Sequence, residues 1–239
     1  MNVVHVSPPR AAYGRSARKR EARADAILDE AMRVLAADGP DALTLARIGK
    51  ALGLVPAALY RYFDSKDALL AALQRRAIAE IRTVLEEELA RVDGESKKRR
   101  WPAEQIPVAK LVACARAYLA LPQTHPEAYL LVAVLLGDPR KLLSDAEANV
   151  TAPLLLALLA DVHALFERAA DAGALSPGDA MERTLAMWAS LQGALSLEKA
   201  RRVAPSLPSA AHIGMTATLG LLTGWGAPPA LLRRSERTA

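Results

Sequence analysis

The chain has 239 residues, enough for one or two domains with a sizeable core, and its net charge is +5. Hydrophobic residues make up 52% of the sequence but aromatic residues only 4%, a balance that favours helices over sheets. Residues 1–66 hold 11 Lys and Arg against 7 Asp and Glu, whereas the remaining residues hold 20 against 19. Positive charge is therefore concentrated near the N-terminus, which favours contact with phosphates there.

The same features exclude several classes of protein. Cys114 is the only cysteine, so no disulfide forms within one chain, and we expect a reducing compartment and a buried, inert thiol. Residues 1–23 lack the apolar core of a secretory signal. The longest apolar runs, 129–136 and 153–160, are too short to span a membrane. We therefore expect a soluble, cytoplasmic protein without membrane contact.

The N-terminal segment is predicted to be a disordered basic arm over residues 1–15, followed by a first helix over residues 16–38. Gly39 and Pro40 stop this helix. Its buried stripe consists of Ile27, Ala31, Val34 and Leu35. The basic residues that begin the segment are Arg10, Arg15, Arg18, Lys19, Arg20 and Arg23.

Residues 44–67 fit two short helices joined by a tight turn, with Thr44 as the N-cap of the first of them. Gly53 stands where the turn needs a positive φ, and Gly49 stands where the two helices approach too closely for a large side chain. The apolar residues recur at the spacing that two steeply crossing helices bury between them: Leu45, Ile48, Leu52, Leu54, Leu59 and Tyr62. This pattern predicts a helix-turn-helix DNA-binding unit.

The run from Leu59 to Leu70, which reads Leu-Tyr-Arg-Tyr-Phe-Asp-Ser-Lys-Asp-Ala-Leu-Leu, resembles the tetracycline-repressor (TetR) family of one-component transcriptional regulators. The first helix, ending in Ala-Ala-Asp-Gly at residues 36–39, is similar to the family's first helix. The resemblance spans roughly residues 20 to 75, and beyond it only the helical layout is similar. It implies an all-α fold with a three-helix helix-turn-helix DNA-binding head over residues 16–66. A larger helical domain over residues 67–235 would bind an effector and form the dimer.

The first turns of the recognition helix offer no side-chain hydrogen bond, because they hold Val55, Pro56, Ala57 and Ala58. The resemblance implies that Tyr60 contacts a base or sugar and that Thr44, Tyr62 and Lys66 hold phosphates. Arg47 is the best candidate for a guanine, although a surface salt bridge would look the same in sequence. Arg61 completes the expected DNA-binding set.

These residues also have purely structural interpretations. Tyr60 and Tyr62 would then be packing aromatics, and the basic arm a solvated tail. Val55 and Pro56 depart from the family pattern at the cap of the recognition helix, where a Ser or Thr is common. We therefore expect specificity to depend on Arg47, on arginines of the arm in the minor groove, and on DNA shape.

Further helices are predicted after the head. Asp64 and Ser65 cap the fourth, which would run to about Val92, before a polar connector over residues 93–104. The basic run at 97–100 is either solvated or a second nucleic-acid contact. The other helices are expected at 105–122, 126–137, 149–173, 177–203 and 209–225. Residues 176–179, Ser-Pro-Gly-Asp, are the predicted start of the 177–203 helix, with Ser176 as its N-cap, Pro177 at the first position and Asp179 at the third.

The resemblance implies an apolar pocket for a small molecule in the C-terminal domain. The bulky or polar residues available to line it are Tyr118, Tyr129, His163, Phe166, Met181, Trp188 and Gln192. Each of them could equally be a core residue. The shortage of aromatic residues favours a hydrophobic or weakly polar effector.

A single head covers only half of a DNA site, so two heads about 34 Å apart are expected. The resemblance implies that helices 177–203 and 209–225 pair with a second copy as a four-helix bundle. Small residues would allow the close approach, although packing within one chain is an open alternative for each: Ala189, Gly193, Ala194, Gly214, Ala217 and Gly220.

Catalytic and metal-binding patterns are missing from the sequence. Its histidines, His5, His125, His163 and His212, have no paired metal spacing, and no phosphate loop or nucleophile elbow occurs. We expect no cofactor and no enzymatic activity.

The predicted function is a homodimeric repressor that binds a palindromic operator on double-stranded DNA and is released by a small apolar ligand. The alternatives are an effector-independent architectural DNA-binding protein and an all-helical enzyme whose basic head is incidental.

Overall fold

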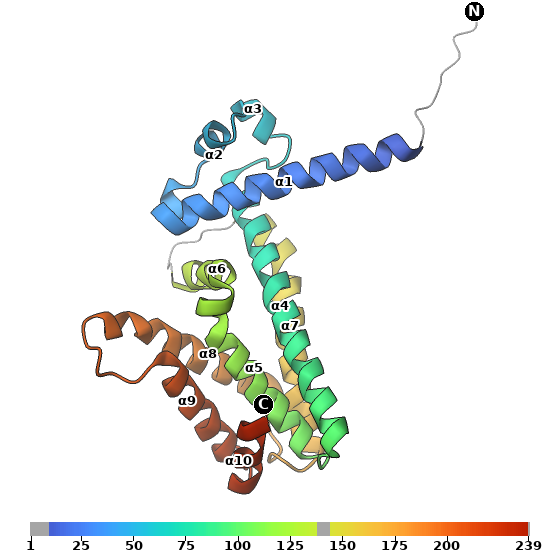
Figure 1. Cartoon of the computed structure of the whole chain (residues 1–239), viewed down its shortest axis with the longest axis vertical. Helices are drawn as coiled ribbons and strands as arrows, with labels where there is room; N and C mark the ends of the chain where they lie inside the picture. The colour runs from blue at the N-terminus through green and yellow to red at the C-terminus, as the bar shows by residue number, and fades with distance from the viewer. Residues whose placement is uncertain (1–9, 138–143, 239) are drawn as a thin grey trace, which may run out of the picture. The chain divides into compact units, whose positions relative to one another are not determined.

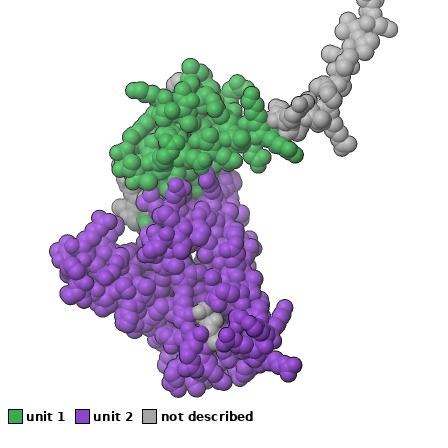
Figure 2. Space-filling model, in the orientation of Figure 1, with its two compact units in different colours: residues 1–74, 133–148 green, residues 75–132, 149–239 purple. Residues whose placement is uncertain are grey.

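The computed structural model describes residues 10–137 and 144–238, and within these ranges the chain is helical and contains no strand (Figure 1). The chain forms two compact units, residues 1–74 with 133–148 and residues 75–132 with 149–239 (Figure 2). We call them unit 1 and unit 2. The division falls within the fourth helix, so this helix belongs to both units. The helices are α1 (Arg10–Asp38), η1 (Pro40–Ala42), α2 (Leu45–Ala51), α3 (Pro56–Leu59), α4 (Lys66–Arg99), α5 (Gln105–Thr124), α6 (Pro126–Gly137), α7 (Asp145–Asp171), α8 (Ala180–Leu197), η2 (Glu198–Arg202), α9 (Ala210–Gly224) and α10 (Pro229–Thr238).

Helix α1 begins at Arg10, so the prediction of disorder over residues 1–15 is wrong for residues 10–15, while residues 1–9 lie outside the described part of the chain. The segment is rich in Ala and Arg, which are strong helix formers, and this extends the helix beyond its buried stripe. Ile27, Ala31 and Leu35 are buried as predicted. Gly39 ends the helix with a φ of 79°, which glycine adopts without steric cost.

The helix-turn-helix forms in unit 1 as the apolar spacing predicts. Thr44 caps α2 by accepting a hydrogen bond from the backbone N–H of Arg47 at 3.2 Å. Ile48 and Leu59 are fully buried, and Gly53 takes a φ of 64° in the turn. A Cβ on Gly49 would lie 2.9 Å from both the Leu54 carbonyl oxygen and a Leu59 methyl group. Close approach of the turn and α3 therefore requires glycine at position 49.

Helix α4 is longer than predicted, because it continues through Gly94 to Arg99 instead of ending near Val92. Glu95 forms an ion pair with Arg99 at 2.8 Å within the last turns, and basic side chains near a helix C-terminus are favourable to its dipole. Asp93 reaches Lys110 of α5 at 2.7 Å. The predicted polar connector over residues 93–104 is thus mostly helix, and the basic run belongs to the end of that helix.

The C-terminal helices differ from the prediction at their ends. Asp179, rather than Ser176, caps α8, and its carboxylate accepts from the backbone N–H groups of Met181 and Glu182 at 2.8 and 2.9 Å. These two hydrogen bonds lower the pKa of Asp179. Helix α8 ends at Leu197 and continues as η2. Helix α10 was not predicted, although its Leu231 and Leu232 are buried.

Helix α7 is long, apolar and sparsely covered. By length and composition it could cross a membrane, and only 17% of its apolar window is buried. A single helix of this kind does not indicate a membrane protein, because helices of soluble domains meet the same criteria. Val150, Leu154 and Leu156 are exposed on it.

We predict that Gly49→Ala destabilises the protein by about 1–3 kcal/mol, because the added methyl group overpacks the crossing of α2 and α3. The matched control is Gly94→Ala, since no atom lies within 4 Å of a Cβ at that helical position. The control should stabilise the protein by about 0.5–1 kcal/mol. Urea unfolding followed by circular dichroism measures both. Equal effects of the two variants would contradict the proposed crossing.

Candidate nucleic-acid interface and ligand cavity

The end of α3 and the residues after it form an exposed surface in unit 1. Tyr60 is 54% exposed, and Ala57 and Arg61 are exposed as well. Ala58 and Tyr62 are half-buried, so the ring of Tyr62 contributes to packing and still reaches the surface. Pro56 begins the helix, but its side chain lies outside the described part. This surface presents one large aromatic ring among small apolar groups.

Thr44 and Lys66 already serve as structural anchors in unit 1. The Thr44 oxygen accepts the capping hydrogen bond of α2, and its hydroxyl hydrogen remains available to another acceptor. The Lys66 ammonium donates to the carbonyl oxygen of Pro40 at 2.6 Å and retains two further N–H donors. Both groups can therefore hold a phosphate oxygen without giving up their structural contacts.

Arg47 forms an ion pair with Asp38 at the end of α1. The two side chains are 46% and 44% exposed, so this is a surface pair of small energetic value. The alternative noted for Arg47, a surface salt bridge, is thus what the DNA-free structure contains. To donate hydrogen bonds to a guanine, the guanidinium of Arg47 has to break its ion pair with Asp38 or bind the base and the carboxylate at the same time.

Unit 1 also contains a basic hollow of about 780 Å³, which includes Arg61 and Tyr62 and which the sequence did not predict. Its side chains come from α1 and from the residues that follow α3: Lys19, Arg20, Ala22, Arg23, Ala26, Arg61 and Tyr62. Arg20 donates to the backbone carbonyl of Arg61 at 3.4 Å, which joins the two segments. The lining holds four cations and no acidic group. A concave basic surface next to an exposed helix is suited to a polyanionic backbone.

Unit 2 contains an apolar cavity of about 80 Å³. No charged side chain lines it, and its polar groups are limited to those of Cys114, Tyr118, Thr184 and Trp188. The remaining lining is aliphatic and comes from five helices, α4 to α8: Ile78, Ile81, Leu85, Val132, Leu155, Leu158, Leu159, Val162, Met187 and Leu191.

Tyr118 is the centre of a short chain of hydrogen bonds at this cavity. Its hydroxyl donates to the Gln192 side-chain oxygen at 2.8 Å and accepts from the Trp188 indole N–H at 3.0 Å. Burial raises the pKa of Tyr118 to about 12, while the hydrogen bond from Trp188 acts in the opposite direction. Burial likewise raises the pKa of the Cys114 thiol to about 12. All groups at the cavity are therefore neutral at physiological pH.

The predicted pocket residues separate into several places. Tyr118 and Trp188 line the apolar cavity, and Gln192 is tied to it through Tyr118. Tyr129 lines a different hollow of unit 2, with a volume of about 500 Å³. Phe166 is a core residue packed edge-to-face against Trp225, with ring centroids 5.4 Å apart. His163 lies 3.6 Å from Glu167 on its own helix, and Met181 belongs to the capped first turn of α8.

No group of three or more His, Cys, Asp or Glu that could hold a metal ion occurs among the described residues. The lining of the apolar cavity contains no acid, base or activated nucleophile, and its thiol and phenol are protonated. The cavity is therefore chemically suited to binding.

Known proteins are similar to both parts of the chain. Residues 27–73 match the family model described as bacterial regulatory proteins, tetR family, and residues 111–217 match the tetracyclin repressor-like C-terminal domain. An uncharacterized HTH-type transcriptional regulator of Mycobacterium tuberculosis, Rv1255c, is 46% identical over 61 residues. That match covers 26% of this chain and about 30% of the length of the curated relative.

Two solved structures share the fold over most of both chains. SmeT, the repressor of the Stenotrophomonas maltophilia multidrug efflux pump SmeDEF, is 21% identical with a TM-score of 0.62, covering 87% of this chain and 92% of its own. AibR, crystallised with isovaleryl coenzyme A and operator DNA, is 19% identical with a TM-score of 0.59, covering 86% and 99%. At these identities the likeness concerns the fold alone.

We predict that Tyr118→Phe destabilises unit 2 by about 1–3 kcal/mol, because the Trp188 N–H and the Gln192 oxygen lose their buried partner. Tyr129→Phe is the matched control.

The phenol pKa of Tyr118 rises from 10.0 to about 12 on folding, so the unfolded chain loses this proton first as the pH rises. The wild type should therefore lose more stability than Tyr118→Phe between about pH 10 and 12. Parallel pH profiles from thermal unfolding would contradict the buried phenol.

Proposed function

The chain belongs to the TetR family of transcriptional regulators, and from this premise we propose that it is a one-component repressor with a palindromic operator. It is a DNA-binding regulator and not an enzyme. In our proposal it binds the operator as a homodimer in the cytoplasm and leaves it when a small apolar ligand occupies unit 2. The surface of unit 1, where exposed Tyr60 adjoins the basic hollow, is the observation that carries the proposal.

DNA binding would combine a helix in the major groove with phosphate contacts on both sides of it. The small residues Ala57 and Ala58 let α3 approach the bases closely and can touch thymine methyl groups. Tyr60 contacts a base or sugar beside them. Thr44, Tyr62 and Lys66 hold phosphates, and Arg20 and Arg61 of the basic hollow extend the contact along the backbone.

Sequence preference would rest on few direct contacts. Arg47 is the available donor for a guanine once its pairing with Asp38 is exchanged for a base edge. Because α1 is helical from Arg10, its basic residues act in our proposal as a helical phosphate-binding segment, whereas a flexible arm was expected to enter the minor groove. DNA shape then contributes the rest of the preference.

Dimerisation is proposed through the outer faces of α8 and α9. One face of α8 is exposed although it contains two leucines, which are usually buried. Its residues recur at helical spacing: Leu185, Ala189, Gly193 and Leu197. Gly220 is exposed on α9, with no atom within 4 Å of a Cβ at that position. Not all of the predicted small residues belong to this face. Ala194 is buried, and Gly214 packs against Leu119 within the same chain.

The chemistry of the apolar cavity selects a neutral, hydrophobic effector. The Tyr118 hydroxyl already donates a hydrogen bond to Gln192 and accepts one from Trp188. A ligand can therefore interact with it only by donating a hydrogen bond to its remaining lone pair. A ligand carboxylate would find no cation there. A cavity of about 80 Å³ is smaller than most ligand sites, so we propose that binding displaces the sparsely covered α7.

Coupling to DNA is proposed to run along α4. This helix begins at Lys66 in unit 1 and carries Ile78, Ile81 and Leu85 in the lining of the cavity. A ligand that moves these side chains also moves the start of the helix and changes the separation of the two heads. Such coupling is typically about 1–3 kcal/mol, or roughly 5- to 150-fold in affinity. A ligand that raises the melting temperature without changing DNA affinity would contradict this regulation and favour an effector-independent DNA-binding protein.

Selection of bound duplexes from a random DNA pool tests the function directly. The proposal predicts recovery of a two-fold symmetric site, and recovery of no common sequence would contradict it. With the selected duplex, the triple variant Lys19→Gln, Arg20→Gln, Arg23→Gln should reduce the slope of log affinity against log salt by about 1 for each phosphate that the protein no longer neutralises.

The matched control for this triple variant is Lys97→Gln, Lys98→Gln, Arg99→Gln at the end of α4. It removes the same charge from the C-terminal end of α4, whereas the phosphate contact proposed for this helix lies at its first residue, Lys66. An equal fall in slope for both triple variants would mean that the basic hollow is only part of a diffuse positive field.

We predict that Ala189→Glu converts the dimer to a monomer, because two carboxylates would be buried across the two-fold axis. Ala152→Glu, on the exposed part of α7, is the matched control and should remain dimeric. Sedimentation equilibrium distinguishes the two states. A dimeric Ala189→Glu variant would exclude this face as the interface.

A further inference from the structure

Unit 2 has a second hollow, larger than the apolar cavity, between α5, η2 and the start of α9. Its volume is about 500 Å³, within the range of small-molecule sites. It shares no lining residue with the apolar cavity. We call it the basic cleft, because Arg116, Lys199, Arg201 and Arg202 line it.

The charge of the basic cleft is unusual for unit 2. Its lining holds four cations and a single carboxylate, that of Glu198. Unit 2 as a whole holds 18 Lys and Arg against 15 Asp and Glu. The formal surplus of the cleft, +3, therefore equals that of the entire unit. Such a local surplus attracts anions.

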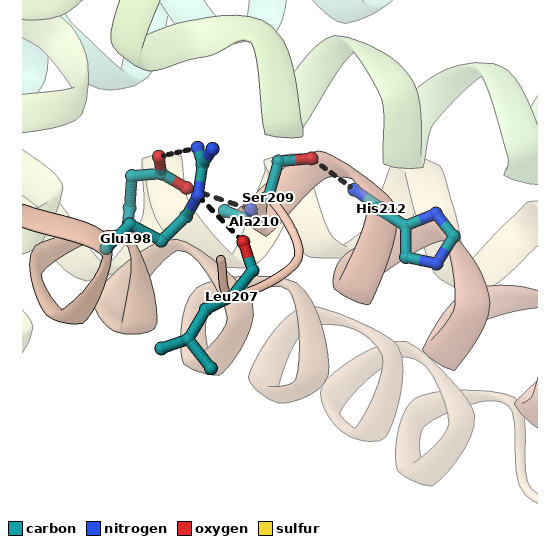
Figure 3. A network of polar contacts seen from close by, with 6 residues as sticks. Glu198, Leu207, Ser209, Ala210 and His212 are labelled. Atoms are coloured by element: carbon teal, nitrogen blue, oxygen red, sulfur yellow. Dashed lines mark hydrogen bonds and ion pairs between the residues drawn. The ribbon is translucent and has the colours of Figure 1, made fainter. Parts of the chain in front are cut away.

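The carboxylate of Glu198 is committed to the wall of the cleft. One of its oxygens pairs with Arg201, and the other accepts the backbone N–H of Ala210 at 2.9 Å (Figure 3). Arg201 also donates to the carbonyl oxygen of Leu207 at 3.1 Å, and Ser209 caps α9 by accepting from the backbone N–H of His212 at 3.2 Å. Together these contacts tie η2, the following loop and the first turn of α9 to one another. The wall is therefore preorganised, which lowers the entropic cost of binding.

Most of the remaining lining of the cleft is apolar. Its hydrophobic side chains are those of Leu119, Pro122, Leu195 and Met215. Leu119 and Leu195 are buried, while Lys199 and Arg202 lie exposed. Arg116 is held by its donation to the backbone carbonyl of Glu236. A site with an apolar floor and a cationic rim matches a ligand that has both characters. A fully hydrated anion would gain nothing from the floor, and a neutral hydrocarbon would gain nothing from the rim.

We propose that the basic cleft is a second ligand site, which binds amphipathic anions that consist of an apolar chain and a carboxylate or phosphate head group. The chain lies on Leu119, Leu195 and Met215, and the head group contacts Lys199 and Arg202. This site is independent of the neutral effector assigned to the apolar cavity. The protein therefore accepts two chemically different ligands in unit 2.

Titration calorimetry of the 239-residue protein with decanoate, decyl phosphate and decanol tests this assignment. Both anions should bind to the basic cleft, where the cations contribute about tenfold in affinity, on the scale of one charge-assisted hydrogen bond, whereas decanol binding belongs to the apolar cavity. Lys199→Gln, Arg202→Gln should weaken the anions about tenfold and leave decanol unchanged. The matched double variant Lys97→Gln, Lys98→Gln should bind all three as the wild type does. A preference for one of the two anions identifies the head group.

A blocking variant locates the site. Ala211→Trp places a large side chain at the exposed lip of the cleft and should abolish anion binding, whereas Ala152→Trp on α7 should not. Circular dichroism and operator binding verify that both variants fold. Unchanged decanoate affinity in Ala211→Trp, or equal losses in the two Lys and Arg double variants, would overturn the proposal.

Discussion

The close crossing of α2 and α3 at Gly49 is the constraint on which the DNA-binding surface depends. The Leu54 carbonyl and a Leu59 methyl group occupy the space that any side chain at position 49 would need. This approach buries Ile48 and Leu59 together and turns Tyr60 outward. A short helix of four residues has little stability of its own, so its orientation comes from these tertiary contacts. The DNA contacts proposed for Tyr60, Tyr62 and Lys66 all follow from that orientation.

Local chemistry made unit 1 predictable from the sequence. Glycine at a positive φ, a threonine cap and apolar residues at helical spacing each have one structural solution, and Gly53, Thr44 and Ile48 adopt it. The basic hollow was not predictable in this way. It depends on the approach of Arg20 to Arg61, which are far apart in the chain, and no local pattern encodes that approach. The helical start at Arg10 was missed because flanking Pro and Gly residues suggested disorder, whereas the Ala and Arg content favours a helix.

Unit 2 was predictable as a set of helices but not as a set of sites. Leucine and isoleucine at helical spacing look the same in a packed core and in a cavity wall, so Ile78 and Leu158 gave no signal. Selecting bulky or polar residues instead identified Tyr118 and Trp188, because their polar atoms need partners when buried. The same criterion also selected Phe166, which belongs to the core. The basic cleft was not predicted, because its cations belong to α5 and η2 and only folding brings these two elements together.

The affinity of Tyr60→Ala for the selected duplex, measured by fluorescence anisotropy at fixed salt, tests the outward orientation of α3 most directly. Tyr60→Phe removes the hydroxyl but keeps the ring, so it distinguishes the contributions of the two groups to affinity. Circular dichroism verifies that both variants fold. We predict a loss of about tenfold or more for Tyr60→Ala, equivalent to at least about 1.4 kcal/mol of binding free energy. Wild-type affinity in a folded Tyr60→Ala variant would mean that this face of unit 1 does not meet DNA.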